Sequence, residues 1–230
     1  MVADGGYLIS VKLKYMATLQ QAASYLAERA GKKTDIPFIR EMKDLVVVIS
    51  ARFKADTLGK TPSLDKYYLQ RFNVPLQAVD KSDECNADIA KCDKVFRSIE
   101  KVPSPLRYTT NPFSYVGAPD GSHGFGWTTF GTEPKRQLKK LTGQFPRHTY
   151  INEYIYIFNK DIDEIGVEGV FSDPRAVAKF KCGGKPCYSD ESEFPIDEQL
   201  LKLVYDEIIT KHLRLIIPNE KILIKEDKNV

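Results

Sequence analysis

Prolines are spaced so closely through the middle of the chain that no long helix can form there. Nine of them fall between residues 75 and 186: Pro75, Pro103, Pro105, Pro112, Pro119, Pro134, Pro146, Pro174 and Pro186. Proline lacks the N–H that a helix interior needs, and its ring clashes with the preceding turn. The apolar runs between these prolines are short, so we predict a β-rich module over residues 74–194.

Six runs in this module are predicted to be strands. They are residues 76–79, 95–99, 113–117, 125–130, 148–158 and 165–171. Asp120-Gly121 has the composition of a hairpin turn, and the segment after Asp173-Pro174 can form a single helical turn.

The most aromatic run, residues 150–158, is predicted to lie in one strand with two apolar faces. One face carries Tyr150, Asn152, Tyr154, Tyr156 and Phe158. The other carries Ile151, Ile155 and Ile157, interrupted by Glu153. Both faces must be covered, one by the chain's own fold and the other by that fold or by another subunit. Because tyrosine is enriched at protein interfaces, we predict a subunit contact at Tyr150, Tyr154, Tyr156 and Phe158.

Residues 1–73 are predicted to form helices. A first apolar stripe ends before a C-capping Gly31, and its members are Tyr15, Leu19, Ala22, Ala23 and Leu26. A second stripe follows Asp35 and Pro37, and its members are Phe38, Met42, Leu45, Val46, Ile49 and Phe53. The β-prone run 46–49 leaves a strand as the rival interpretation. A third, shorter helix capped by Ser63 would carry Leu64, Tyr68 and Phe72 on one side.

A further helix is predicted in residues 195–214. Asp197 can cap it, and its buried stripe is Leu200, Leu203, Val204 and Ile208. Residues 215–230 follow as an extended tail. The predicted fold is therefore α+β: a small helical bundle, made of the N-terminal helix hairpin and the C-terminal helix, with a large β-rich insertion and an extended C-terminal tail.

Composition excludes several classes of protein. The hydrophobic fraction of 42% and the charged fraction of 28% are those of an ordinary globular chain. The net charge of +3 is too small to indicate a nucleic-acid-binding protein by itself. The longest apolar run, Leu45–Ile49, is far too short for a membrane span, and the first residues, MVADGG, do not resemble a secretory signal. We therefore expect synthesis in the cytoplasm.

The four cysteines form two pairs in the sequence, Cys85 with Cys92 and Cys182 with Cys187. Zinc knuckles usually place two to four residues between paired ligands. Cys182 and Cys187 just meet that spacing, but Cys85 and Cys92 are too far apart. Four unrelated cysteines are thus favoured over a zinc site, and no metal or other cofactor is expected.

No group of residues indicates catalysis. Ser122 and His123 are adjacent in sequence, which predicts diverging side chains, and no nucleophile elbow surrounds them. The acidic segments 161–164 and 190–193 lack the pattern of a calcium loop, and no phosphate-binding loop occurs. The expected function is not enzymatic.

One basic segment is a candidate nucleic-acid contact: Lys135, Arg136, Lys139 and Lys140. A run of charge is more often a solvated face, and no strand carries the aromatic pattern of an RNA-recognition motif. A soluble nucleic-acid-binding module is therefore kept as an alternative function.

Several short segments are distinctive as a set, although none carries a known chemistry. They are CDKVFRS (92–98), PLRY (105–108), residues 112–117, residues 142–159, IGVEGVFSDP (165–174) and CYSDESEFPI (187–196). Together they resemble the neck proteins of crAss-like tailed bacteriophages, which are virion structural proteins known as ring or head-to-tail connector proteins. The resemblance covers most of the chain from about residue 64 to residue 215.

The predicted layout of helices, β insertion, helix and tail is also similar to the connector (adaptor) fold found beneath the portals of short-tailed phages. This second resemblance implies a head-to-tail connector that forms a closed homo-oligomeric ring, a dodecamer, in the virion neck below the capsid portal. The implied partners are the portal, other neck or tail rings, and genomic DNA that passes without sequence specificity; no membrane is involved. The basic residues Lys135, Arg136, Lys139 and Lys140 would line the lumen of this ring. In adaptors of this type the C-terminal extension reaches the portal, which places that contact at Leu215, Ile216, Ile217, Ile222, Leu223 and Ile224.

Overall fold

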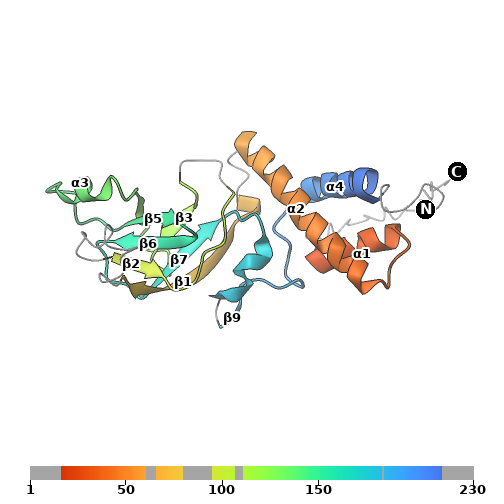
Figure 1. Ribbon diagram of the computed structural model, residues 1–230, viewed down its shortest axis with the longest axis horizontal. Helices are drawn as coiled ribbons and strands as arrows, with labels where there is room; N and C mark the ends of the chain where they lie inside the picture. The colour runs from red at the N-terminus through yellow and green to blue at the C-terminus, as the bar shows by residue number, and fades with distance from the viewer. Residues whose placement is uncertain (1–16, 61–65, 80–94, 107–110, 183, 214–230) are drawn as a thin grey trace, which may run out of the picture.

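The computed structural model describes residues 17–60, 66–79, 95–106, 111–182 and 184–213. Its helices are α1 (Leu19–Arg29), α2 (Ile36–Lys60), α3 (Glu133–Gln137) and α4 (Glu198–Glu207), with a 3₁₀ helix at Pro174–Lys179 and a π-helical turn at Ile208–Leu213. Its strands are β1 (Gln70–Ala78), β2 (Val95–Ser98), β3 (Tyr115–Gly117), β4 (Gly126–Trp127), β5 (Arg147–Ile151), β6 (Tyr154–Phe158), β7 (Glu164–Gly169), β8 (Lys181–Cys182) and β9 (Lys185–Pro186). Figure 1 shows an elongated molecule with α1, α2 and α4 at one end and the large sheet at the other.

The two N-terminal helices form where the sequence predicts them. Thr18 and Gln21 make a reciprocal capping box that starts α1, and Gly31 takes a left-handed φ of 70° just after its end. The Asp35 Oδ1 atom accepts a hydrogen bond of 3.0 Å from the Phe38 N–H and so caps α2. The run 46–49 is helical, so the rival strand interpretation is wrong. Burial of the α2 stripe against α1 outweighs the β propensity of three valines.

The predicted third helix is wrong. Its proposed cap, Ser63, lies outside the described residues, and Phe72 lies in β1. Phe72, Val74 and Leu76 are buried while Arg71, Pro75 and Gln77 are exposed, which is the alternation of a strand. The helical spacing of Tyr68 and Phe72 is therefore coincidental, because period-two burial over nine residues decides the conformation.

The large sheet has the strand order β3-β7-β1-β2-β6-β5-β4 and is antiparallel except for the β4–β5 pair. Its two edges come together. Gly117 of β3 bridges Gly124, and the Phe125 N–H donates to the Val116 carbonyl over 2.7 Å just before β4 begins. The sheet thus curls until its edge strands are joined through the hairpin loop that contains Asp120-Gly121, as the turn composition predicts.

Residues 150–158 do not form one strand but turn back as the β5–β6 hairpin. Asn152 and Glu153 have φ values of 52° and 68°, the paired left-handed conformation of a tight two-residue turn. Tyr150 pairs with Ile155 and Thr149 pairs with Tyr156, so the two faces of the hairpin mix residues that the single-strand prediction separated. Asparagine tolerates the left-handed conformation, so Asn152 is the residue in the sequence that could have indicated this turn.

The C-terminal helix starts as predicted, with the Leu200 N–H donating to Asp197 Oδ1 over 2.9 Å. It packs against α2, which also packs against α1. Leu203 was predicted to be buried but is 50% exposed, because the stripe that faces α2 runs through Leu200, Leu201, Val204 and Ile208. The α+β class is confirmed. No helix in the described part of the chain is long and apolar enough to cross a membrane.

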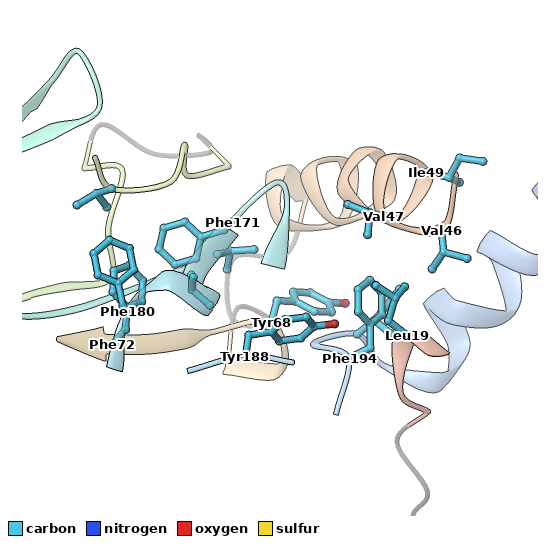
Figure 2. Packing of buried hydrophobic residues seen from close by; sticks show 14 of the residues in the cluster. Leu19, Val46, Val47, Ile49, Tyr68, Phe72, Phe171, Phe180, Tyr188 and Phe194 are labelled. Carbon is cyan, nitrogen blue, oxygen red and sulfur yellow. The ribbon is translucent and has the colours of Figure 1, made fainter. Parts of the chain in front are cut away.

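One core joins the helical end to the sheet. In Figure 2, Tyr68, Tyr188 and Phe194 lie between two groups of side chains: Phe72 of β1 with Phe171 and Phe180, and the helical residues Leu19, Val46 and Val47. All of these side chains are buried.

Candidate functional site

The β5–β6 hairpin has two buried faces, and the chain itself covers both. Tyr150 and Ile155 belong to the main core. On the other face, Tyr156 and Phe158 pack edge-on against Phe130, at ring-centroid distances of 5.1 and 5.5 Å. Phe130 comes from the segment between β4 and β5, so that segment acts as the second cover.

The residues predicted to contact another subunit are therefore mostly enclosed within one chain. Tyr150, Tyr156 and Phe158 are buried, and Tyr154 is half-buried with the Arg97 guanidinium 4.9 Å from its ring centroid. A contact of this hairpin with a neighbour stays a prediction that a single chain does not test.

A buried ion pair fixes the covering segment to the hairpin. Arg147 Nη1 of β5 donates to Glu133 Oε1 of α3 over 2.8 Å, and Asn159 Nδ2 donates to the same oxygen over 3.1 Å. Glu133 is fully buried and Arg147 is 6% exposed. Burying two charges is costly unless hydrogen bonds satisfy them. Glu133 Oε1 accepts both bonds, whereas Glu133 Oε2 is buried without a partner among the described residues, so the pair ties α3 to β5 through one oxygen.

The same two side chains also hold the far end of the segment. Arg147 Nη2 donates to the Thr142 carbonyl, and Asn159 Nδ2 donates to the Gly143 carbonyl over 3.0 Å. Both ends of residues 133–143 are thus anchored on β5 and on the residue that follows β6. This anchoring could not be predicted from the sequence, because no local pattern indicates that a Glu and an Arg 14 residues apart form an ion pair.

What this anchored segment presents to solvent is a mixed basic and apolar surface, which we call the α3 surface. It consists of Lys135, Arg136, Leu138, Lys139, Lys140, Leu141 and Phe145. All seven are exposed, and the exposed fractions of Leu138 and Leu141 are 87% and 86%. Arg136 donates weakly to the Trp127 carbonyl over 3.4 Å. Within the described residues, the three lysines make no ion pair. The structure thus brings the four predicted cations together and adds three apolar side chains that the prediction missed.

A groove of about 430 Å³ lies beside Phe145. Its lining is mostly apolar and includes Phe125, Phe145, Pro146 and Ile162, and its charged members are Arg147 and Lys160. None of its lining residues is a carboxylate. The groove therefore extends the apolar and basic character of the α3 surface.

His148 is buried behind this region on β5. Its Nδ1 atom lies 2.9 Å from the Phe125 carbonyl, and burial lowers the pKa of the imidazole to about 4. The sequence favours a surface or capping role for His148, and the surface role is wrong because the ring is only 1% exposed.

The hairpin loop gives one correction. Ser122 Oγ lies 2.8 Å from His123 Nδ1, so the prediction that these side chains diverge is wrong. Asp120 Oδ1 accepts from the Ser122 backbone N–H, which makes a local Asx turn that brings the two together. A catalytic triad needs the carboxylate on the imidazole, whereas here it bonds the backbone.

The joint between the helical end and the sheet contains a buried lysine. Lys54 of α2 is 1% exposed, with its Nζ atom 5.0 Å from the Phe194 ring and 5.8 Å from the Tyr68 ring. Desolvation lowers the pKa of Lys54 to about 7, although Asp173 and Asp197 act in the opposite direction. Tyr68 Oη donates to Asp197 Oδ2 over 2.5 Å, which links this cluster to the cap of α4.

Two cysteines are joined. Cys182 and Cys187 form a disulfide across the β8–β9 hairpin, which the sequence analysis did not predict. Cys85 and Cys92 lie outside the described residues, as do the predicted portal contacts Leu215, Ile216, Ile217, Ile222, Leu223 and Ile224. No cluster of metal-ligating side chains occurs within the described residues.

Comparison with known protein families gives a match. The model of a family described as phage tail ring protein 2 (CrAss_Ring_2) matches residues 23–227, which is most of the chain. No curated protein matches.

Proposed function

The chain belongs to the phage tail ring protein 2 family of crAss-like phages, and from this we propose that it forms one ring of the head-to-tail connector below the capsid portal. Membership makes it a structural ring protein of the phage tail and places it in the virion. The finer assignment is an adaptor in the neck, assembled as a dodecamer, with the portal on one side and further rings on the other.

The observation that carries this proposal is the α3 surface. A stable monomer has no evident use for two leucines that are nearly fully exposed on a segment anchored by a buried ion pair. An assembly explains both features, because the apolar side chains become buried when the next chain or the next ring is added. The proposed role requires no catalysis, so we infer that the protein is not an enzyme.

Passage of DNA through the ring is a further part of the proposal. Exposed cations such as Lys135 and Arg136 would meet the phosphate backbone without reading its sequence. Leu138 and Leu141 are exposed on the same surface, and such apolar side chains argue against DNA as its sole occupant. We therefore assign only part of the cation set to the channel.

The decisive experiment is quantitative mass spectrometry of purified virions. We expect this chain at the same copy number as the portal, or at a simple ratio to it, together with rotational symmetry in averaged images of isolated necks. A chain missing from mature particles would contradict the proposal.

The four cations also support the alternative, a soluble nucleic-acid-binding module. That alternative predicts that the isolated monomer binds DNA with an affinity that falls steeply as salt rises. A monomer that assembles into rings but ignores DNA would exclude it.

A further inference from the structure

A ring of identical subunits needs two different surfaces on each chain, because each subunit meets its neighbours head to tail. The α3 surface supplies a basic and apolar one. Its complement on the same chain would be acidic and apolar, and would lie where a neighbour's α3 surface can reach it.

Helix α4 carries such a surface. Its exposed residues are Glu198, Gln199, Lys202, Leu203 and Asp206. At about 100° per residue they fall on one arc of the helix, roughly 140° wide. Two of these five residues are acidic and one, Lys202, is basic, so the net charge of this surface is negative. Within the described residues, neither Glu198 nor Asp206 takes part in an ion pair, and Leu203, at the edge of the arc, is 50% exposed.

The two surfaces lie far apart on one molecule. Figure 1 shows α3 at the sheet end and α4 at the helical end of the elongated chain. They are therefore unable to cover each other within a subunit, whereas head-to-tail contact between copies places one against the other. Opposite charge would bring them together, and the leucines would lose their contact with water.

We propose that the α3 surface of one copy docks on the α4 surface of the next copy and forms the contact between neighbours in the ring. This rests on the ring function proposed above. Lys139 and Lys140 meet Asp206 and Glu198, while Leu138 and Leu141 pack against Leu203.

A charge-swap experiment tests this pairing. One variant carries Lys139→Glu and Lys140→Glu, and a second carries Glu198→Lys and Asp206→Lys. All four positions are exposed, and circular dichroism checks that each full-length variant is folded. Self-association is followed by mass photometry and analytical ultracentrifugation. We expect each variant alone to associate about tenfold more weakly than the wild type, or worse.

The informative sample is an equimolar mixture of the two variants. Every junction in an alternating ring then pairs a basic surface with an acidic one, so we expect the mixture to assemble as the wild type does. Lys181→Glu with Lys185→Glu, on the exposed β8–β9 hairpin, is the matched control and should assemble normally.

Variants that assemble alone like the wild type, or a mixture that fails to assemble, would overturn the pairing. So would a wild-type chain that remains monomeric at the highest concentration reached. If the variant with Lys139→Glu and Lys140→Glu loses DNA binding but assembles normally, the α3 surface binds nucleic acid and does not form the contact between subunits. The proposed function has a separate test, because ring-like copy number in virions does not depend on which surfaces meet.

Discussion

At the scale of single residues, the buried pair Glu133–Arg147 has the clearest energetic consequence. Replacing Glu133 by Gln leaves the Arg147 charge buried without its counter-ion, and breaking such pairs destabilises proteins by about 3–5 kcal/mol. We expect a loss of this order in the free energy of unfolding, measured by urea denaturation. The control is Glu153→Gln, which removes the exposed partner of Lys101 and should lower the free energy of unfolding far less, because solvent screens an exposed ion pair. Equal effects would contradict the role given to the buried pair.

Lys54 predicts how stability depends on pH. Its pKa is about 7 in the folded chain against an ordinary 10.5, so the unfolded chain binds more protons between these values. Stability therefore rises with pH in that window, by up to about 1.4 kcal/mol per pH unit. Raised pKa values of buried tyrosines oppose the trend above pH 10. Urea denaturation at pH 7.5, 8.5 and 9.5 measures the slope.

Lys54→Met is the comparison for this slope, because it keeps the length of the side chain and removes the charge. We expect the variant to be more stable than the wild type at pH 7.5 and nearly independent of pH up to 9.5. A slope that survives the substitution would show that another group titrates.

At the scale of elements, the β5–β6 turn holds a glutamate in a conformation that suits glycine. Glu153 has a φ of 68°, which costs a residue with a Cβ about 1 kcal/mol. Glu153→Gly relieves this strain but loses the Lys101 contact, whereas Glu153→Ala loses the contact and keeps the strain. We expect the glycine variant to be more stable than the alanine variant by about 1 kcal/mol in thermal unfolding. The reverse order would exclude strain at this turn.

The helices could be predicted from the sequence, whereas the β5–β6 hairpin was not. Helices α1, α2 and α4 were predicted because caps such as Asp35 and Asp197 stand beside stripes of helical period. The hairpin was missed because Asn152-Glu153 lacks the glycine that usually marks such a turn. For the candidate site, the cations could be located from sequence, whereas the Glu133–Arg147 anchor and the exposure of Leu138 depend on contacts between segments that no local pattern encodes.

At the scale of the whole molecule, the joint between the two ends is built to be rigid. Arg175 of the 3₁₀ helix forms ion pairs with Asp173, which caps the same helix, and with Asp44 of α2. Lys43 of α2 forms a further ion pair with Asp190. The hydrophobic core of Figure 2 also joins the two ends. If this joint is held fixed, it sets the orientation of the α3 surface relative to the α4 surface, and the rotation between two docked copies then determines how many copies close the proposed ring.

The C-terminal tail is predicted to serve portal docking and not the stability of the folded chain. We predict that deleting residues 215–230 leaves the chain folded, with its free energy of unfolding unchanged within about 0.5 kcal/mol. We expect the truncated chain to form rings, because neither the α3 surface nor the α4 surface is removed, but to lose its binding to portal complexes. Co-sedimentation with portal rings measures this loss. The control replaces Ile222, Leu223 and Ile224 by serine, which keeps the length of the tail and removes three of its apolar residues. If the truncated chain docks on the portal as the wild type does, the tail has no part in that contact, and the portal must be met by the folded part of the ring.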